Sequence, residues 1–261
     1  LVDRPHSVVD DLRDEGVPVR RLGNGRIADP RWVRDLLAEL RDGEVDILHV
    51  HSPLPGSIAR VVLAVTRRRV RVVVTEHNRW DRYARPTRWV NRATFGLNDA
   101  ALAVSADCRS TMPQKIQARV RVLEHGIDAD AVLNSLNQGQ RVREELGIAD
   151  DASVIGTVAN LREQKNYPLM LGAAKSVLAD HPNLVFLAVG QGPLEASLKQ
   201  LHDELGLGDR FRFLGFRSDA TDVMAALDVF MLGSHHEGLP VALMEAMTLG
   251  LPIVSTAVGG I

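Results

Sequence analysis

A chain of 261 residues is long enough for one large domain or two small ones. Its 45% hydrophobic and 25% charged residues are typical of a soluble globular protein, and its net charge of −2 argues against general nucleic-acid binding. No apolar run approaches the roughly 20 residues of a membrane span. The single cysteine, Cys108, cannot form an internal disulfide, so nothing indicates an oxidising compartment, and we expect a cytoplasmic location.

Short apolar runs rich in β-branched residues alternate with amphipathic stretches along the whole chain. Strands are predicted at Val17–Arg21, Val45–Val50, Val70–Thr75, Ala100–Val104 and Arg119–Leu123, and then at Val154–Val158, Leu184–Val189, Arg210–Phe213, Val229–Leu232 and Ile253–Ser255. Helices are predicted at Ser7–Glu15, Pro30–Arg41, Leu54–Thr66, Pro168–Ala179 and Pro193–Glu204. Alternating strands and helices predict two α/β domains with parallel sheets.

The alternation pauses in the polar stretch Asp128–Ala152, which contains only a short predicted helix, Val142–Leu146. We therefore predict a domain boundary near residue 150, between domains 1–150 and 151–261. Ligands of two such sheets would bind at the carboxyl ends of the strands, in a cleft.

The most informative segment is Ser234–Gly260, which reads SHHEGLPVALMEAMTLGLPIVSTAVGG. Glu237 and Glu245 lie eight positions apart, and Pro240 suits the first position of a helix from about Pro240 to Leu249. The free N–H groups at the start of such a helix can hold an anion, and carboxylates beside them suit neutral hydroxyls. The segment therefore predicts a site for a sugar carrying phosphate, although an ordinary αβ unit also needs such glycines and prolines.

This segment resembles the donor-site signature of family-4 retaining glycosyltransferases: Glu-Gly-Leu-Pro, a second Glu eight positions on, Gly-x-Pro-x-Val and a closing Gly-Gly. The resemblance implies the GT-B fold, in which two Rossmann-like α/β domains have parallel sheets facing across a cleft. It also implies that the first strand and its Gly-rich loop precede Leu1, and that the second domain continues past Ile261. We therefore expect a chain truncated at both ends.

The resemblance assigns roles within the segment. Glu237 would act on the sugar by accepting hydrogen bonds from its hydroxyls, backbone groups around Gly238, Leu239 and Pro240 would contact sugar or phosphate, and Glu245 would bind the ribose. His235 and His236 are adjacent and lack further Cys or His ligands nearby, which makes a poor metal site, so we expect no obligatory metal and no cofactor.

Basic residues follow the strand Val154–Val158. Arg162 and Lys165 could stabilise a departing diphosphate, where fixed positive charge helps most. The family's lysine position holds Lys165, but its usual arginine position holds Asn160. Both cations are also typical of a solvated loop.

Two further turns match the family's donor domain. Gly190 begins a Gly-x-Gly-Pro turn, which is equally typical of a plain strand–helix connection. By resemblance, Phe216 or Arg217 would border the nucleotide base. The alternative for this loop is capping of a helix Ala220–Ala226 by Ser218 or Asp219.

In the first half, histidines follow two strands. His77 matches a family histidine near the acceptor hydroxyl or donor sugar, and His49 and His51 end the preceding strand. A lone histidine is also commonly a satisfied polar residue.

The segment Arg79–Arg92 interleaves five arginines with Trp80, Tyr83 and Trp89, and a second basic cluster comprises Arg67–Arg69 and Arg71. Basic residues beside interfacial aromatics can dock on anionic lipid at the inner face of the cell membrane. A solvated helix face is the alternative.

The expected function is that of a retaining glycosyltransferase of polysaccharide biosynthesis, moving a sugar from a nucleotide-sugar, with UDP as the expected nucleotide, to a hydroxyl of a glycan or lipid-linked acceptor. The alternatives are a sugar epimerase of the same architecture and a non-catalytic nucleotide-sugar-binding fragment.

Overall fold

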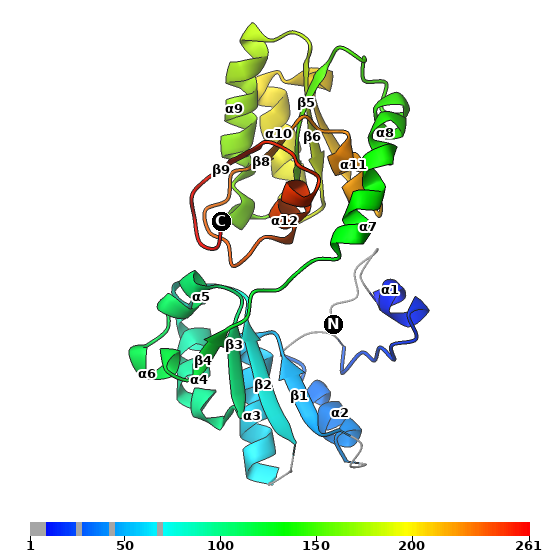
Figure 1. The fold of residues 1–261 in the computed structure, drawn as a ribbon. Coiled ribbons are helices and arrows are strands. Elements are labelled where there is room, and N and C mark those ends of the chain that lie inside the picture. Colours follow the sequence, from blue (N-terminus) through cyan, green and yellow to red (C-terminus); the bar gives the residue numbers. More distant parts are fainter. Residues whose placement is uncertain (1–8, 25–27, 42–44, 67–69) are drawn as a thin grey trace. The chain divides into compact units, whose positions relative to one another are not determined.

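The chain folds into two compact units, Leu1–Glu124 and His125–Ile261 (Figure 1). The computed structural model describes residues 9–24, 28–41, 45–66 and 70–261. The predicted basic cluster at Arg67–Arg69 and the start of the predicted helix Ser7–Glu15 lie outside these residues.

The first unit is built on a four-stranded parallel sheet with the strand order β1-β2-β3-β4. Its strands are β1 (Ile47–Val50), β2 (Arg71–Glu76), β3 (Ala100–Ala103) and β4 (Val120–Val122). Its helices are α1 (Val9–Asp14), α2 (Arg31–Glu39), α3 (Pro53–Thr66), α4 (Arg85–Thr94), α5 (Ala106–Ser110) and α6 (Gln114–Gln117), with 3-10 turns η1 (Trp80–Arg82) and η2 (Phe95–Leu97).

The predicted strand at Val17–Arg21 is wrong, because this segment has no strand structure and pairs with no described strand. Pro18 is its second residue and lacks the N–H group that a ladder hydrogen bond needs. Val17 is exposed and Val19 is only half-buried, so neither valine lies in the core.

Helix α4 is fixed to α3 and β2 by a buried polar network. The Arg60 side chain is only 1% exposed and donates to Asn91 Oδ1 at 2.6 Å and to Asn98 Oδ1 at 3.2 Å. Glu76 accepts from Asn91 Nδ2 and from the Tyr83 hydroxyl, each at 2.8 Å. Burial lowers the pKa of Arg60 to about 10 and raises the pKa of Glu76, so these hydrogen bonds offset a real desolvation cost.

The second unit is built on a five-stranded parallel sheet with the strand order β7-β6-β5-β8-β9. Its strands are β5 (Ser153–Val158), β6 (Leu184–Val189), β7 (Phe211–Gly215), β8 (Val229–Leu232) and β9 (Ile253–Ser255). Its helices are α7 (Ala129–Asn134), α8 (Gly139–Glu145), α9 (Tyr167–Asp180), α10 (Glu195–Leu205), α11 (Ala220–Ala225) and α12 (Val241–Thr248), with 3-10 turns η3 (Ser135–Gln138), η4 (Glu163–Lys165) and η5 (Gly208–Arg210). This is a doubly wound sheet, and its strand order reverses between β5 and β8, where ligands of such folds bind.

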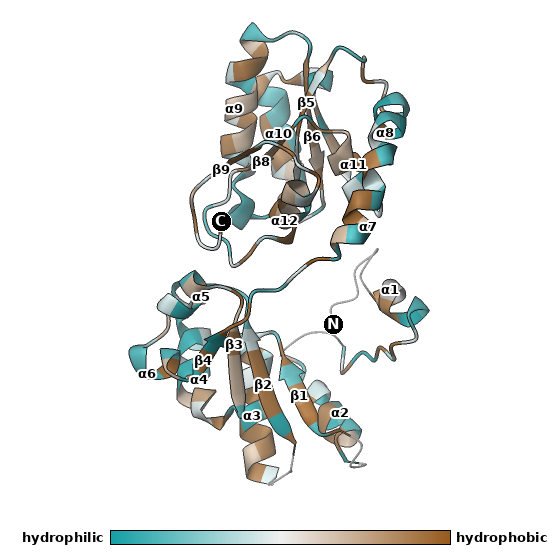
Figure 2. Ribbon diagram, viewed as in Figure 1, coloured by the Kyte–Doolittle hydropathy of each residue, from teal (hydrophilic) through white to brown (hydrophobic). Residues whose placement is uncertain are grey.

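The division between the units lies between Glu124 and His125, before the boundary predicted near residue 150. The polar stretch that suggested the later boundary belongs to the second unit. Helix α8 is largely hydrophilic (Figure 2), yet its Val142 is fully buried in the same core as Val154 of β5. Arg143 completes this attachment by donating to the Ala226 carbonyl at 2.9 Å.

Candidate functional site

A lysine–glutamate pair lies where the sheet of the second unit reverses its strand order. Lys165 follows β5, Glu237 follows β8, and Lys165 Nζ donates to Glu237 Oε1 at 2.6 Å. Ser234 Oγ donates to the same oxygen, and Gln164 Nε2 donates to Oε2 at 3.2 Å. The two charged side chains are 18% and 5% exposed, so this is a nearly buried ion pair with additional hydrogen bonds.

The remaining hydrogen-bonding capacity of this pair suits a phosphorylated sugar. A carboxylate offers about four acceptor directions, and three are taken at Glu237. An ammonium has three donors, and only one is used by Glu237 at Lys165. One acceptor direction thus remains for a hydroxyl, and two donors remain for an anion.

The backbone around Glu237 is held from two sides. His235 N donates to the Gln164 carbonyl at 2.8 Å, which ties the loop after β8 to the loop after β5. Gly259, with a φ of +61°, packs so closely that a Cβ there would lie 2.0 Å from the Glu237 carbonyl oxygen. Only glycine fits at this position, which gives the closing Gly-Gly of the sequence signature a physical reason.

Helix α12 begins one residue later than predicted. Pro240 is its N-cap, with extended backbone, and the first helical residue is Val241. Gly238 is buried and Leu239 is half-buried beside this helix start. The predicted sugar-contacting backbone therefore lies between Glu237 and the N-terminus of α12.

Glu245 lies on α12 and has no salt-bridge or hydrogen-bond partner for its carboxyl group among the residues that the structure describes. Burial raises the pKa of this carboxyl. A half-buried carboxylate without an internal partner is suited to accept hydrogen bonds from ligand hydroxyls.

Arg162 and Lys165 have different surroundings. Arg162 is exposed at the start of η4, and no other described residue holds its side chain, whereas Lys165 joins the buried pair. The structure therefore brings Lys165, and not Arg162, together with Glu237.

The glycine turn after β6 is a packing feature. Gly190 has a φ of +146°, and a Cβ there would lie 2.0 Å from the Ala159 carbonyl oxygen. Its N–H donates to the Gly215 carbonyl at 2.8 Å. Gly190 therefore lets the loops after β5, β6 and β7 approach one another.

Phe216 and Arg217, which follow β7, have different surroundings. The Arg217 guanidinium donates to both carboxylate oxygens of Asp219, each at 2.7 Å, and to both of Glu145 on α8. These contacts raise the pKa of Arg217 and lower those of Glu145 and Asp219. Asp219 is the N-cap residue of α11, but its side chain makes no cap hydrogen bond. Phe216 is 43% exposed, which leaves it the better candidate for contact with a base.

Three histidines cluster in the first unit, where β1 and β2 end. His51 Nδ1 and His77 Nε2 lie 2.8 Å apart, and His49 Nε2 lies 2.8 Å from Thr75 Oγ1. The His49 and His51 rings are 4.2 Å apart. Burial, with the neighbouring His49 as the second cause, lowers the pKa of His51 and favours its neutral form. The sequence did not reveal the His51–His77 contact, although both residues end neighbouring parallel strands.

The predicted lipid-docking segment Arg79–Arg92 is only partly exposed. Trp80 is 1% exposed and packs edge-on against Phe95, and the Tyr83 hydroxyl is bound to Glu76. Arg79 is paired with Asp81 and Asp107. The exposed aromatic residue of this segment is Trp89, so of its three aromatics only Trp89 is well placed to meet a lipid surface.

No helix in the described ranges is long and apolar enough to cross a membrane. Across the same ranges, no group of three or more His, Cys, Asp or Glu side chains is placed to hold a metal ion.

Two α/β units, each built on a parallel sheet, are typical of the GT-B class of fold. A solved structure of this class, Anabaena Alr3699/HepE in complex with UDP and glucose, superposes with a TM-score of 0.81 at 21% identity, over 97% of this chain and 71% of that one.

The chain belongs to the family-4, group 1 glycosyltransferases. The family described as Glycosyltransferase Family 4 matches residues 3–131, and the one described as Glycosyl transferases group 1 matches residues 139–261.

Two curated relatives illustrate the family. The UDP-Gal:alpha-D-GlcNAc-diphosphoundecaprenol alpha-1,3-galactosyltransferase of Escherichia coli is 26% identical over 96% of this chain and 68% of its own length. The 2-deoxystreptamine glucosyltransferase of Streptomyces kanamyceticus is 28% identical over 88% of this chain and 62% of its own length. The chain thus spans about two thirds of the length of these relatives.

Proposed function

We propose that this protein transfers a sugar from a UDP-sugar to a hydroxyl of a glycan or lipid-linked acceptor, with retention of the anomeric configuration. The observation that carries the proposal is the nearly buried Lys165–Glu237 pair at the strand-order reversal of the second unit. The Escherichia coli relative, whose name specifies UDP-Gal as its donor, supports it, as does the UDP and glucose complex of the Anabaena neighbour.

In this proposal, the second unit binds the donor. Two N–H groups of Lys165 and the N-terminus of α12 hold the diphosphate, and Glu245 accepts hydrogen bonds from the ribose. Phe216 borders the base. Glu237 keeps Lys165 in place and accepts one sugar hydroxyl, and Arg162 adds positive charge at the edge of the site.

The proposed reaction breaks the bond between the anomeric carbon and the diphosphate oxygen, whose electron pair leaves with the diphosphate. The acceptor oxygen bonds to the anomeric carbon on the same face, and its proton passes to the leaving diphosphate. Negative charge grows on the diphosphate during this step, so the fixed charge of Lys165 stabilises the transition state more than the ground state. His77, oriented by His51, binds a hydroxyl near the reacting atoms.

We also propose peripheral contact with an anionic membrane at the cytoplasmic face. It uses the exposed residues Arg85, Trp89 and Arg92 of the basic segment, together with the half-buried Arg88.

Thermal shift with a panel of nucleotides, followed by a transfer assay, tests the function. A UDP concentration one hundred times Kd should stabilise the chain by about 2.7 kcal/mol. Transfer with retained configuration supports the proposal, whereas a changed free sugar formed without acceptor identifies an epimerase. Binding of UDP-sugar without any turnover, even with lipid-linked acceptors, identifies a binding module. Absence of UDP binding refutes the donor assignment.

A further inference from the structure

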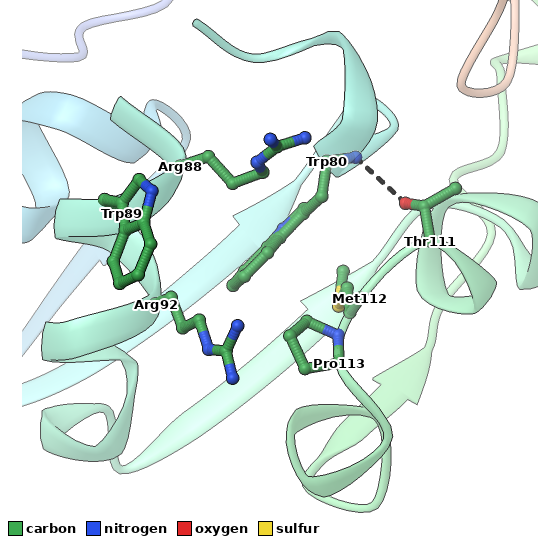
Figure 3. Close-up of a pocket in the computed structure, with 7 residues that line it drawn as sticks. All are labelled: Trp80, Arg88, Trp89, Arg92, Thr111, Met112 and Pro113. Atoms are coloured by element: carbon green, nitrogen blue, oxygen red, sulfur yellow. Dashed lines mark hydrogen bonds between the residues drawn. The ribbon is translucent and has the colours of Figure 1, made fainter. Parts of the chain in front are cut away.

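A pocket of about 450 Å³ lies in the first unit, and the three histidines are not among its lining residues (Figure 3). Its walls come from segments that follow β2 and β3. Helix α4 provides Arg88, Trp89 and Arg92, and the connection between α5 and α6 provides Thr111, Met112 and Pro113. Trp80 of η1 lies between these two walls (Figure 3).

The pocket carries positive charge that no acidic side chain in the described part of the chain neutralises. Arg88 and Arg92 are one helical turn apart, and their guanidinium groups extend toward the same side (Figure 3). Neither pairs with an acidic residue anywhere in the described ranges, in contrast to Arg79, whose guanidinium binds Asp81 and Asp107. Arginine forks bind phosphate oxygens in a bidentate manner, and residues four apart on a helix have Cβ atoms about 5–6 Å apart. This spacing suits two linked phosphate groups.

The pocket is held in shape without a ligand. The Trp80 N–H of the main chain donates to Thr111 Oγ1 at 2.9 Å, which joins the two walls (Figure 3). The Trp80 ring packs edge-on against Phe95, at 5.5 Å between centroids. Asn91, between the two arginines in sequence, anchors α4 through Arg60 and Glu76. The arginines therefore project from a fixed helix, which reduces the ordering cost of binding.

Apolar surface adjoins the charge. Trp89, which lines the pocket next to Arg88 in sequence, is 69% exposed. Met112 and Pro113 line the opposite wall. A ligand that fits all of these groups has both a phosphate-rich head and an apolar chain.

We propose that this pocket binds the diphosphate of a prenyl-linked acceptor, with its apolar chain against Trp89. The inference rests on the proposed function, and the acceptor in the name of the Escherichia coli relative, an alpha-D-GlcNAc-diphosphoundecaprenol, has this chemistry. The pocket would hold the acceptor by its anchor, independently of the donor site in the second unit.

The test measures binding of farnesyl diphosphate to the intact chain by calorimetry, and compares it with inorganic pyrophosphate and with phosphatidylglycerol-containing vesicles. Arg88→Gln and Arg92→Gln should each weaken farnesyl diphosphate binding about tenfold, the cost of one charge-assisted contact. The charge-matched control Arg121→Gln alters one exposed arginine of β4 outside the pocket and should bind like the unaltered chain. Arg88→Lys/Arg92→Lys retains charge without the fork and should recover little of the loss.

The outcomes separate the sources of phosphate. Equal affinity for pyrophosphate and farnesyl diphosphate overturns the prenyl part of the proposal. Vesicle binding that needs Arg88 and Arg92, without farnesyl diphosphate binding, overturns it in favour of a bilayer surface. Equal losses in the pocket and control variants also refute it. UDP binding is measured in parallel: UDP bound without farnesyl diphosphate refutes this inference alone, and the reverse refutes the proposed donor function alone.

Discussion

The tight contact between Gly259 and Glu237 makes a quantitative prediction. In Gly259→Ala, the new Cβ would start 2.0 Å from the Glu237 carbonyl oxygen, and ordinary contacts begin at 3.4 Å. The atoms it would meet are main-chain atoms of Glu237, so the backbone at residue 259 and the backbone at Glu237 must separate by about 1.4 Å. Left-handed backbone costs alanine about 1–2 kcal/mol, and forcing an added methyl group into packed surroundings costs about 1–3 kcal/mol more.

The control is Gly206→Ala. Gly206 has a similar φ, +66°, but a Cβ there meets nothing within 4 Å, so this variant reports the backbone cost alone. We expect urea unfolding to show a loss of about 1–2 kcal/mol for Gly206→Ala and about 2–5 kcal/mol for Gly259→Ala.

Donor affinity separates the two glycine variants further. Displacement of Glu237 should weaken UDP-sugar binding roughly tenfold or more in Gly259→Ala, the value of one hydrogen bond to a charged group, and leave Gly206→Ala unchanged. Identical stability and identical affinity of the two variants would refute the idea that Gly259 supports Glu237.

The remaining predictions concern donor binding and the buried pair. Burial raises the pKa of Glu245 above its unfolded value. UDP affinity should therefore fall as the pH drops through that raised pKa, while the unliganded fold gains stability. Glu245→Gln should remove both pH dependences and raise the melting temperature at neutral pH. Lys165→Met leaves Glu237 buried without its cation and should lower the free energy of unfolding in urea by about 3 kcal/mol. Lys165→Met/Glu237→Leu should cost less, because no buried charge remains. A larger loss in the double variant would contradict the pairing. Phe216→Ala should weaken UDP binding tenfold or more through lost base stacking, of about 1–3 kcal/mol. Arg217→Gln should instead cost about 1 kcal/mol of stability with UDP affinity kept within twofold, and a greater effect on affinity would restore a base-reading role.

The fold was predictable where one local signal dominates. The strands Leu184–Val189, Val229–Leu232 and Ile253–Ser255 have the predicted bounds, because each is a short apolar run between turns. The boundary expected near 150 differs from the division at Glu124 and His125 because α8 is mostly polar, and its attachment depends on the few residues that face the core, such as Val142.

The sequence could not show contacts between residues that are distant in the chain. Arg217 and Glu145 are 72 residues apart, so no local pattern shows that this guanidinium is already occupied. The burial of Trp80 was not predictable either, because an aromatic residue that lies between charged residues in sequence is expected to be exposed. In the structure, Trp80 lies in η1 and its side chain is buried. The proximity of Lys165 and Glu237 was implied only by the resemblance, and it arises from two parallel strands ending at the same edge of the sheet.

The buried Arg60 network also governs how the surface of the first unit can vary. A purely apolar contact between α3 and α4 would tolerate sliding or rotation, since dispersion contacts have little directionality. Hydrogen bonds from Arg60 to Asn91 and Asn98 and from Asn91 to Glu76 tolerate neither. The rotation of α4 about its axis is therefore fixed by its buried residues. Substitutions at its outward positions leave the same positions facing the pocket.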